Sequence, residues 1–354
     1  RSDVAAVLQI PEAESCGFSC VLVVHSPVET EVAVVYDTVD GEKAYPLCKI
    51  PADPGCNEIQ VYTLEGQESI GNIRYFKERY LEETPVFDAK IPSDEVIDII
   101  IPIYNGLQYF DKLFAGIEKT KMKYRLILVD DQSPDPAVRE YLDRYVAEHE
   151  GTILLRNEKN MGFLPSVNRA LAIAEHHVAL VNTDVEVPEG WLERLMWPIF
   201  TKEKVASSTP FTTCGTICSF PNFCEDNVIF EGMPLWQIDD AFRQIRPQYA
   251  TMPTGIGFCM GMNLEAIREV GLLDEENFDK GYGEENDWCQ RAIQAGYTNV
   301  QVENLFVYHK HGGSFSSEEK LRLLKSHLER LAKKHPNYNS DTAAFCRRDP
   351  ARTI

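Results

Sequence analysis

Apolar and polar positions follow two different patterns along the chain, and the change comes near residue 95. Before this point, short apolar runs alternate with turn sequences; the runs are CVLVVHS (20–26), EVAVVYD (31–37) and EIQVYTL (58–64). Short strands at this spacing are typical of a small β-sandwich. We therefore expect a β-rich accessory domain and its linker over residues 1–94.

From residue 95 onward, apolar strand-like runs alternate with helix-like segments. The first run, VIDIIIPIY (96–104), is apolar almost throughout, as is usual for a strand that is buried on both faces. Helix and strand patterns then alternate at 107–120, 124–131, 135–149, 151–157, 164–177 and 178–184. This order predicts an α/β domain over 95–315, with a mostly parallel, Rossmann-like sheet and helices on both faces. Residues 316–354 are expected to form a C-terminal helix, at 316–335, and a polar tail.

Oxygen-bearing side chains gather where the predicted strands end, and in parallel sheets ligands bind at the carboxyl ends of the strands. The two-residue period of a strand places Asn182 and Asp184 on the same side. A turn followed by a helix cap explains the Asp130–Asp131 pair as well as a ligand site does. The strand-end residues are Pro102, Tyr104, Asn105, Asp130, Asp131, Asn182, Thr183 and Asp184.

The balance of charge limits the class of ligand. The chain carries 35 Lys and Arg residues against 55 Asp and Glu, for a net charge of −20. Such a field repels nucleic acids and anionic lipid surfaces, so a phosphate-bearing substrate would need a locally bound cation. Asp184 offers an oxygen ligand of the kind that Mg²⁺ and Mn²⁺ prefer. His309 and, as a second choice, His311 add imidazoles at the end of another strand-like run, FVYHKHGGSF (306–315).

The ten cysteines point to reduced thiols rather than to a metal cluster. Cys214, Cys218 and Cys224 are close in sequence, but their spacing does not fit the paired Cys-x-x-Cys ligands of a zinc site. No apolar run approaches the ~18 residues of a membrane span. We expect a cytoplasmic protein, with peripheral contact at the inner face of the membrane as the alternative. Because the chain begins with Arg1 rather than Met, we also expect a piece of a larger multidomain polypeptide.

The sequence GYGEENDWCQRA (281–292) places three acids, Glu284, Glu285 and Asp287, within four positions. Acids in a first helical turn are stabilised by the helix dipole, which explains one or two of them. Closely placed carboxylates also raise at least one pKa, which suits a general base. On a helix, Glu285 faces a different side from Glu284 and Arg291, so the two glutamates are expected to have different neighbours. The residues alone leave both interpretations open.

Six segments, in this order, resemble the family-2 inverting glycosyltransferases of the GT-A fold over about residues 96–315. They are PIYNG, VDDQSPD, NEKNMGFLPSVNRA, NTD, GYGEENDWCQRA and VYHKHGGSF. The resemblance is closest to the rhamnosyltransferase-like, O-antigen branch. NTD stands at the family's Asp-x-Asp position, so Asn182 replaces the first acid. The resemblance therefore assigns metal binding to Asp184 with His309, and His311 is the second choice.

The resemblance also implies roles for the other matching residues. Glu285 would be the catalytic base, with Glu284 and Asp287 beside it, and Asp131 would hydrogen-bond the nucleobase. The implied nucleotide-sugar-binding residues are Pro102, Tyr104, Asn105, Asp131, Asn160, Gly162, Phe163, Asn168, Asn182 and Thr183.

The function implied is that of a metal-dependent inverting glycosyltransferase that uses Mn²⁺ or Mg²⁺ and a nucleotide-diphosphate sugar. The acceptor would be a hydroxyl group of a glycan or a lipid-linked saccharide in polysaccharide, O-antigen or cell-surface glycan synthesis. One alternative is a nucleotidyltransferase or a sugar-nucleotide dehydrogenase, although PIYNGLQ (102–108) lacks the Gly-x-Gly-x-x-Gly of a Rossmann dehydrogenase. Because Asn182 replaces an acid of the family motif, a non-catalytic glycan- or nucleotide-binding module is a second alternative.

Overall fold

The computed structural model describes residues 94–224, 227, 233–245, 247–278, 283–310 and 317–348, together with residue 52 and four strands nearer the N-terminus. The chain divides into two compact units, residues 1–82 and 83–354. The second unit holds every candidate site residue, and all of these except His311 lie within the described ranges.

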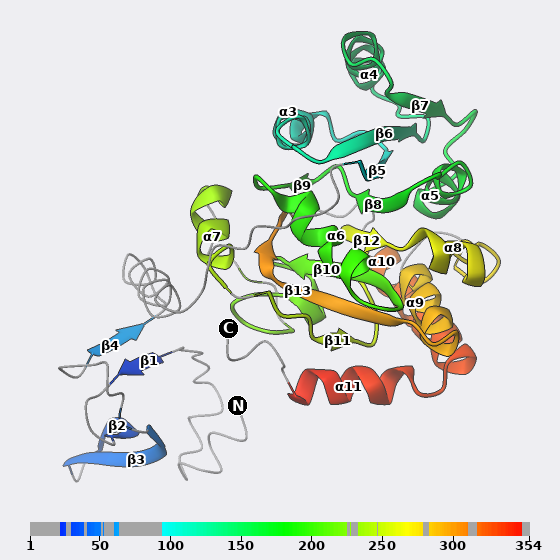
Figure 1. Ribbon diagram of the computed structural model, residues 1–354. Helices are drawn as coiled ribbons and strands as arrows, with labels where there is room; N and C mark the ends of the chain where they lie inside the picture. Colours follow the sequence, from blue (N-terminus) through cyan, green and yellow to red (C-terminus); the bar gives the residue numbers. More distant parts are fainter. Residues whose placement is uncertain are drawn as a thin grey trace. The chain divides into compact units, whose positions relative to one another are not determined.

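The described strands of the first unit form two antiparallel pairs (Figure 1). β1 (Leu22–His25) pairs with β4 (Gln60–Thr63), and β2 (Thr30–Thr38) pairs with β3 (Gly41–Ile50). β1, β2 and β4 coincide with the three apolar runs that predict strands. β3 has a charged, Pro-containing sequence, and it becomes a strand through its pairing with β2. The packing of these strands into a sandwich remains a prediction, and the linker before residue 94 lies outside the described residues.

The second unit is built around one eight-stranded sheet with the order β11-β13-β10-β12-β8-β5-β6-β7 (Figure 1). Six of its strands run in one direction, and β11 and β12 run in the other. The mostly parallel sheet predicted from the sequence is therefore confirmed. Its strands are β5 (Val96–Ile103), β6 (Lys123–Asp130), β7 (Ile153–Arg156), β8 (His177–Val181), β10 (Val205–Phe211), β11 (Thr251–Met252), β12 (Cys259–Met262) and β13 (Thr298–Phe306).

Helices cover both faces of this sheet, as predicted. Alternate residues of β5 face opposite sides: Ile99 belongs to one buried cluster and Ile100 to the other. The cluster with Ile99 includes side chains of α3 (Leu107–Glu118), α4 (Pro136–Glu148) and α6 (Trp191–Thr201). The cluster with Ile100 includes side chains of α5 (Phe163–Leu171), α8 (Leu264–Val270) and α9 (Glu284–Gln294).

Short and terminal elements complete the described part of the unit. A small antiparallel sheet pairs β9 (Val185–Glu186) with β14 (Tyr308–His309). The 3-10 helix η2 spans Thr216–Cys218, and α7 spans Leu235–Phe242. Helix α10 (Ser317–Lys334) matches the predicted C-terminal helix. Of the helices in the described ranges, none has both the length and the apolar character to cross a bilayer.

Helix α5 ends at Leu171, whereas the sequence predicted a helix up to residue 177. The buried carboxylate of Asp98 explains the difference. Its Oδ2 accepts the backbone N–H groups of Glu175 and His176 at 2.8 and 3.2 Å, and Arg125 pairs with both of its oxygens at 2.8 Å. These bonds draw the chain out of the helix and into β8.

The polar tail predicted for residues 336–354 is wrong in its first part, because Tyr338–Arg348 form a further helix, α11. Tyr338 and Phe345 lie seven residues apart, so both point from the same face of the helix. They are only 6% and 3% exposed. Two buried aromatic rings thus anchor a segment that otherwise reads as polar.

Candidate active site

The strands that run in one direction bring their carboxyl ends to the same edge of the sheet. Asn105 follows β5, and its N–H donates to Ser133 Oγ at 3.0 Å in the loop after β6. Gly106 lies against the loop after β8, where a Cβ atom on it would be 3.4 Å from Thr183 Oγ1. The loops after β5, β6 and β8 are therefore neighbours, and five of the ten predicted nucleotide-sugar-binding residues lie in them: Tyr104, Asn105, Asp131, Asn182 and Thr183.

The loop after β5 turns sharply and leaves an aromatic ring exposed. Pro102 is buried within β5, and Asn105 and Gly106 both have left-handed backbone conformations, with φ of 58° and 83°. Tyr104, between the strand and this turn, is 42% exposed. Its ring is available to a flat ligand at this edge.

Asp131 is buried and organises the loop that follows β7. Its Oδ1 accepts Asn157 Nδ2 and the N–H of Met161, and its Oδ2 accepts the N–H of Gly162, all at 2.7 Å. Three of the roughly four acceptor positions of a carboxylate are thus used within the chain. Asp131 therefore fixes the loop that follows β7, and about one acceptor position of its carboxylate remains for another donor.

The remaining residues predicted to lie beside the nucleotide-sugar have different environments. Asn160 is exposed, and Phe163 is half-buried in the first turn of α5. Asn168 is buried: its Nδ2 donates to Leu273 O at 2.8 Å and Glu275 Oε1 at 2.7 Å, and its Oδ1 accepts the N–H of Leu273 at 3.0 Å. Asn168 therefore fastens α5 to the loop that precedes α9.

Asp184 and His309 meet where β9 pairs with β14. His309 lies opposite Val185 in this pairing, and His309 Nε2 is 3.3 Å from Asp184 Oδ1. The backbone also closes this contact, because the N–H of Lys310 donates to Asp184 O at 3.0 Å. We call Asp184 and His309 the cation pair. His311 lies outside the described residues.

Two further side chains hold the ring of His309, and the sequence did not connect either of them with this site. Phe258 stacks on the ring, with centroids 5.0 Å apart and planes inclined by 18°. Cys214 Sγ lies 3.6 Å from His309 Nδ1, on the side opposite Asp184. Burial lowers the pKa of His309, but hydrogen bonds to Asp184 and Cys214 raise it to about 9. These contacts leave Nε2 directed at Asp184.

The cation pair fits a divalent metal ion. An oxygen and a nitrogen 3.3 Å apart have the separation of neighbouring ligands that each lie ~2.1 Å from Mn²⁺ or Mg²⁺. Nearby, Asn182 Oδ1 is buried and has no hydrogen-bond donor among the described residues. Within the described ranges, no three His, Cys, Asp or Glu side chains form a metal-binding group by themselves. The residues present thus fit a cation whose other ligands are waters and phosphate oxygens.

Glu284 and Glu285, which we call the acid pair, begin helix α9. Gly283 precedes them with φ of 128°, and a Cβ atom there would lie 2.9 Å from Phe278 Cε1, so a larger residue does not fit. Burial raises the pKa of Glu284 well above its usual value, and the charge of Glu285 raises it further. Burial also raises the pKa of Glu285, whereas hydrogen bonds from backbone N–H groups and from Glu284 lower it. Glu284 is thus the protonated residue of the acid pair and donates a hydrogen bond to Glu285. Glu285 is the residue that ionises.

Segment 253–258 connects α9 to the cation pair. At its first end, Thr254 Oγ1 donates to Asn286 Oδ1 at 2.9 Å, and the N–H of Gly255 donates to Cys289 Sγ at 3.1 Å. Asn286 and Cys289 belong to the first two turns of α9, directly after the acid pair. The first end of the segment is therefore fixed to the helix that carries Glu285.

The second end of segment 253–258 is fixed to the cation pair. Phe258 stacks on His309, and its carbonyl oxygen accepts the N–H of Asn182 at 2.9 Å. Four residue steps separate Thr254 from Phe258, so the backbone between them spans at most ~14 Å. Segment 253–258 therefore links the helix that carries the acid pair to the cation pair through a short stretch of backbone.

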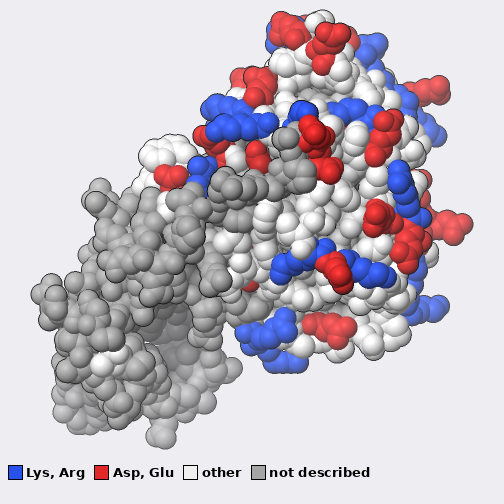
Figure 2. All heavy atoms as spheres, in the orientation of Figure 1, with Lys and Arg blue, Asp and Glu red and all other residues white. Residues whose placement is uncertain are grey.

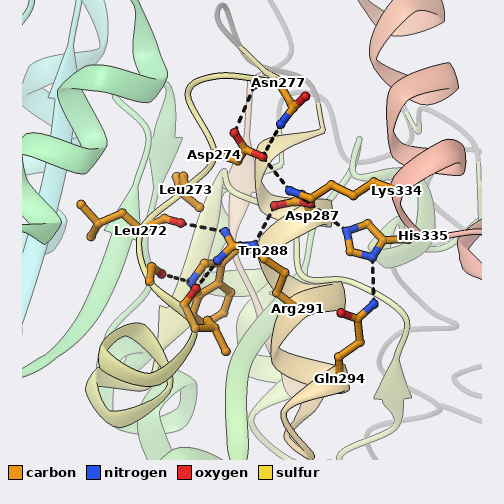
Figure 3. Close-up of polar contacts among 12 residues, drawn as sticks. Leu272, Leu273, Asp274, Asn277, Asp287, Trp288, Arg291, Gln294, Lys334 and His335 are labelled. Carbon is orange, nitrogen blue, oxygen red and sulfur yellow. Dashed lines mark hydrogen bonds and ion pairs between the residues drawn. The ribbon is translucent and has the colours of Figure 1, made fainter.

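Asp287, the third acid of the motif, is fully buried and bound on three sides (Figure 3). Its carboxylate accepts Arg291 Nε at 2.8 Å, Lys334 Nζ at 2.7 Å and His335 Nε2 at 2.7 Å. Lys334 also pairs with Asp274, at 2.6 Å. Burial raises the pKa of Asp287, but these hydrogen bonds outweigh it and lower the pKa. Asp287 thus joins α9 to the end of α10, and its oxygens are held by Arg291, Lys334 and the ring of His335.

The acidic net charge is not concentrated in one visible patch. On the face shown in Figure 2, basic and acidic side chains of the described residues are interspersed around a largely uncharged central region. Local cations rather than the overall field therefore decide where an anionic group can bind.

Comparisons of sequence find similarity to glycosyltransferases. Residues 98–271 match the sequence model of Glycosyl transferase family 2. Polypeptide N-acetylgalactosaminyltransferase 18 of Mus musculus is 28% identical over 269 residues, which cover 68% of this chain and 40% of the relative. N-acetylgalactosaminyltransferase 7 of Drosophila melanogaster is 26% identical over 239 residues, with coverages of 61% and 40%. The chain thus spans about 40% of the length of these curated relatives.

Solved structures share the fold. GalNAc-T7 with UDP, GalNAc and Mn²⁺ matches with a TM-score of 0.50 at 16% identity, over 78% of this chain and 60% of that one. The mannosyltransferase PcManGT from Pyrobaculum calidifontis, in complex with GDP-Man and Mn²⁺, matches with a TM-score of 0.51 at 13% identity, over 80% and 82%. At such identities the likeness concerns the fold, which is the expected GT-A type. The residues that match the family 2 sequence model, 98–271, thus lie in a unit with the GT-A type of fold.

Proposed function

We propose that this chain transfers a sugar from a nucleotide-diphosphate sugar to a hydroxyl group of a glycan or lipid-linked acceptor, with inversion at the anomeric carbon. The observation that carries the proposal is the arrangement of segment 253–258, which joins the acid pair to the cation pair. A displacement of this kind needs a stabilised leaving group on one side of the sugar and a base on the other.

On the donor side, the exposed ring of Tyr104 would stack on the nucleobase, and the remaining acceptor position of Asp131 would receive a hydrogen bond from it. Asp184 and His309 would hold Mn²⁺ or Mg²⁺, which when bound neutralises charge on the diphosphate leaving group. Asn182, with its buried amide oxygen, would accept a hydrogen bond from a hydroxyl group or a water of the bound donor.

On the acceptor side, Glu285 would remove the proton of the attacking hydroxyl group. Its Oε2 is buried and has no hydrogen-bond donor among the described residues, and an acceptor hydroxyl group is such a donor. Glu284 would stay protonated and hold the carboxylate of Glu285 in place. Asp287 would position both through the start of α9, rather than transfer a proton itself.

The names of the relatives give a ranking of the candidate sugar donors. N-acetylgalactosamine is named for both curated relatives, and UDP accompanies it in one solved structure, so UDP-GalNAc comes first. GDP-mannose comes second. A dTDP-linked deoxyhexose, suggested by the rhamnosyltransferase-like motifs, comes third. The acceptor context of polysaccharide or O-antigen synthesis rests on the motifs alone.

A donor panel tests the proposal directly. The protein is incubated with each nucleotide sugar, Mn²⁺ and a mixture of glycan acceptors, and nucleotide release and product linkage are followed. We expect release with one donor and, by NMR, an inverted anomer in the product. Product with retained configuration would reject Glu285 as the base of a direct displacement, and release of pyrophosphate would identify a nucleotidyltransferase.

The cation pair gives a separate prediction. Asp184→Asn should weaken binding of Mn²⁺ with the nucleoside diphosphate by on the order of 100-fold, because a charged metal ligand is worth several kcal/mol. Titration calorimetry measures this without any turnover. Glu186→Gln is the matched control: it removes a nearby acid that pairs with Lys112 on the surface, and it should bind normally. Equal affinity in the wild type and Asp184→Asn would contradict the assignment.

One observation supports a second candidate, a non-catalytic nucleotide-binding module. Asn182 stands where the family motif has an acid, which leaves Asp184 as the one acid of that loop segment. Such a module would bind the nucleoside diphosphate in calorimetry yet release no nucleotide from any donor on the panel. The two measurements together therefore separate an enzyme from a binding module.

A further inference from the structure

Two cysteines that are 122 residues apart in sequence meet at the surface of the second unit. Cys224 Sγ lies 3.3 Å from Cys346 Sγ. Cys346 belongs to α11, and Cys224 follows η2 in the segment after β10. Both are thiols. They are therefore close enough for a disulfide to form after a small movement of either side chain.

The packing of the adjacent residues, Phe223 and Phe345, holds the two thiols close together. Phe223 and Phe345, the residues directly before them, have ring centroids 5.8 Å apart. Phe345 is 3% exposed, and Cys346 packs against the same core cluster. Phe223 thus contacts Phe345, and Cys224 contacts Cys346. The thiols lie together because the aromatic rings beneath them dock α11 on this segment.

The other thiols of the described residues are placed differently. Cys218, Cys259 and Cys289 are fully buried, and burial raises the pKa of each. Such thiols rarely ionise and are out of reach of a reagent in solution. Cys214 is half-buried beside His309. Cys224 is exposed. A dissolved oxidant would therefore reach Cys224, with Cys346 next to it.

We propose that Cys224 and Cys346 are a modification site at which a reversible disulfide forms by exchange with a small disulfide such as glutathione disulfide. The thiolate of Cys224 attacks one sulfur of the reagent, and a glutathione thiolate leaves. The thiolate of Cys346 then attacks Cys224 Sγ in the mixed disulfide and displaces the second glutathione. Two cysteine thiols are oxidised, one glutathione disulfide is reduced, and two protons are released to the thiol products.

The disulfide would join two elements that border the candidate active site. The segment that ends at Cys224 begins at Thr212 and Thr213, and Thr213 Oγ1 donates to His309 O at 3.3 Å. The helix that carries Cys346 begins with Tyr338, whose pKa is raised by burial and by the charge of Glu285. A bond between Cys224 and Cys346 would thus clamp together one element beside His309 and one beside Glu285. Its formation does not depend on the transfer reaction.

Peptide mapping tests the bond without an activity assay. The full chain is equilibrated with glutathione disulfide or with dithiothreitol, the remaining thiols are alkylated, and the denatured protein is digested with chymotrypsin. Cleavage after Phe223, Phe230 and Phe345 leaves each cysteine in its own peptide, 224–230 and 346–354. We expect a linked pair of these peptides, two hydrogens lighter than their sum, after oxidation and none after reduction.

Serine variants complete the experiment. Cys224→Ser and Cys346→Ser should each abolish the linked pair, whereas Cys214→Ser should keep it. The wild type should also melt several degrees higher when oxidised, because the bond closes a long loop, and neither of the first two variants should show this difference. The proposal is overturned if oxidation leaves peptides 224–230 and 346–354 separately alkylated or glutathionylated, or joins Cys346 to another cysteine.

Discussion

Glu284 and Glu285 are neighbours in sequence but have opposite tasks in this account. Burial raises the pKa of both, and the hydrogen bond between them keeps the proton on Glu284 and the charge on Glu285. A buried carboxylate with a raised pKa is a stronger base than an exposed one, which is what removal of a hydroxyl proton needs. The presence of Glu284 beside Glu285 therefore helps to set the pKa of Glu285.

The roles of Glu284 and Glu285 can be distinguished by the pH profile of kcat/KM. Glu285 must be ionised to act, so kcat/KM should rise as pH increases through the raised pKa of Glu285 in the free enzyme. Glu284→Ala removes the hydrogen-bond donor that lowers this pKa, so the acidic limb should move to higher pH. Glu284→Gln keeps a donor and should move the limb less. Identical acidic limbs in the wild type and Glu284→Ala would contradict the pairing.

At single residues, the sequence located the polar groups but not their partners. The strand-end rule placed Asp131 and Asp184 at the same edge, because the end of an apolar run is readable from periodicity. It could not show that Asp131 is engaged by the loop at 157–162, since those donors are 26 to 31 residues away. Cys214 and Phe258 were missed as neighbours of His309 for the same reason: neither belongs to a motif that names a contact.

Helix α9 is held in place by α10, which lies beyond the region that matches the family. The contacts are those of Asp287 with Lys334 and His335, and of Lys334 with Asp274. Although burial raises the pKa of Asp274, hydrogen bonds from Lys334 and Asn277 lower it to about 2. The position of the acid pair thus depends on an ion-pair network between two helices distant in sequence.

Lys334→Met tests this network through its pH dependence. We expect the free energy of unfolding to fall by ~1–2 kcal/mol at pH 7, since two charge-assisted hydrogen bonds are lost at a partly exposed site. A carboxyl with a lowered folded pKa stabilises the fold above its unfolded pKa and loses this effect as pH falls. The difference from the wild type should therefore be full near pH 6 and shrink between about pH 4 and pH 2.

Denaturant unfolding at several pH values measures this difference, and Lys333→Met serves as the exposed neighbouring control. A destabilisation that is equally large at pH 7 and near pH 2 would indicate lost packing of the lysine stem rather than lost ion pairs.

At the level of elements, the order of strands and helices from residue 96 to 181 was predictable, because long apolar runs and helical periods are local patterns. The failures have non-local causes. Helix α5 does not continue to residue 177 because Asp98, on β5, accepts the N–H groups of Glu175 and His176. β3 is a strand because β2 pairs with it, and α11 is a helix because two aromatic rings find a place in the core. None of these partners is adjacent in sequence.

For the whole second unit, the sequence predicted the fold class but not how the sheet is completed. β12 runs opposite to its neighbours β8 and β10 and lies between them, although it follows both in sequence. This insertion places Phe258, the last residue of segment 253–258, at the carboxyl end of β8 beside Asn182 and His309, while the first end of the segment contacts α9. The site therefore depends on a long-range strand pairing that periodicity does not encode. The cytoplasmic location and the larger polypeptide stay predictions.

The most direct test of the account is the turnover of Glu285→Gln compared with its donor affinity. The glutamine keeps the size of the side chain but cannot take a proton, so kcat should fall by about 10² to 10⁴ while the dissociation constant of the nucleotide sugar stays within about twofold. Glu285→Asp should retain part of the activity, and the exposed Glu276→Gln should retain all of it. Ordinary turnover by Glu285→Gln, with donor binding intact, would contradict the assignment of the base and with it the proposed mechanism.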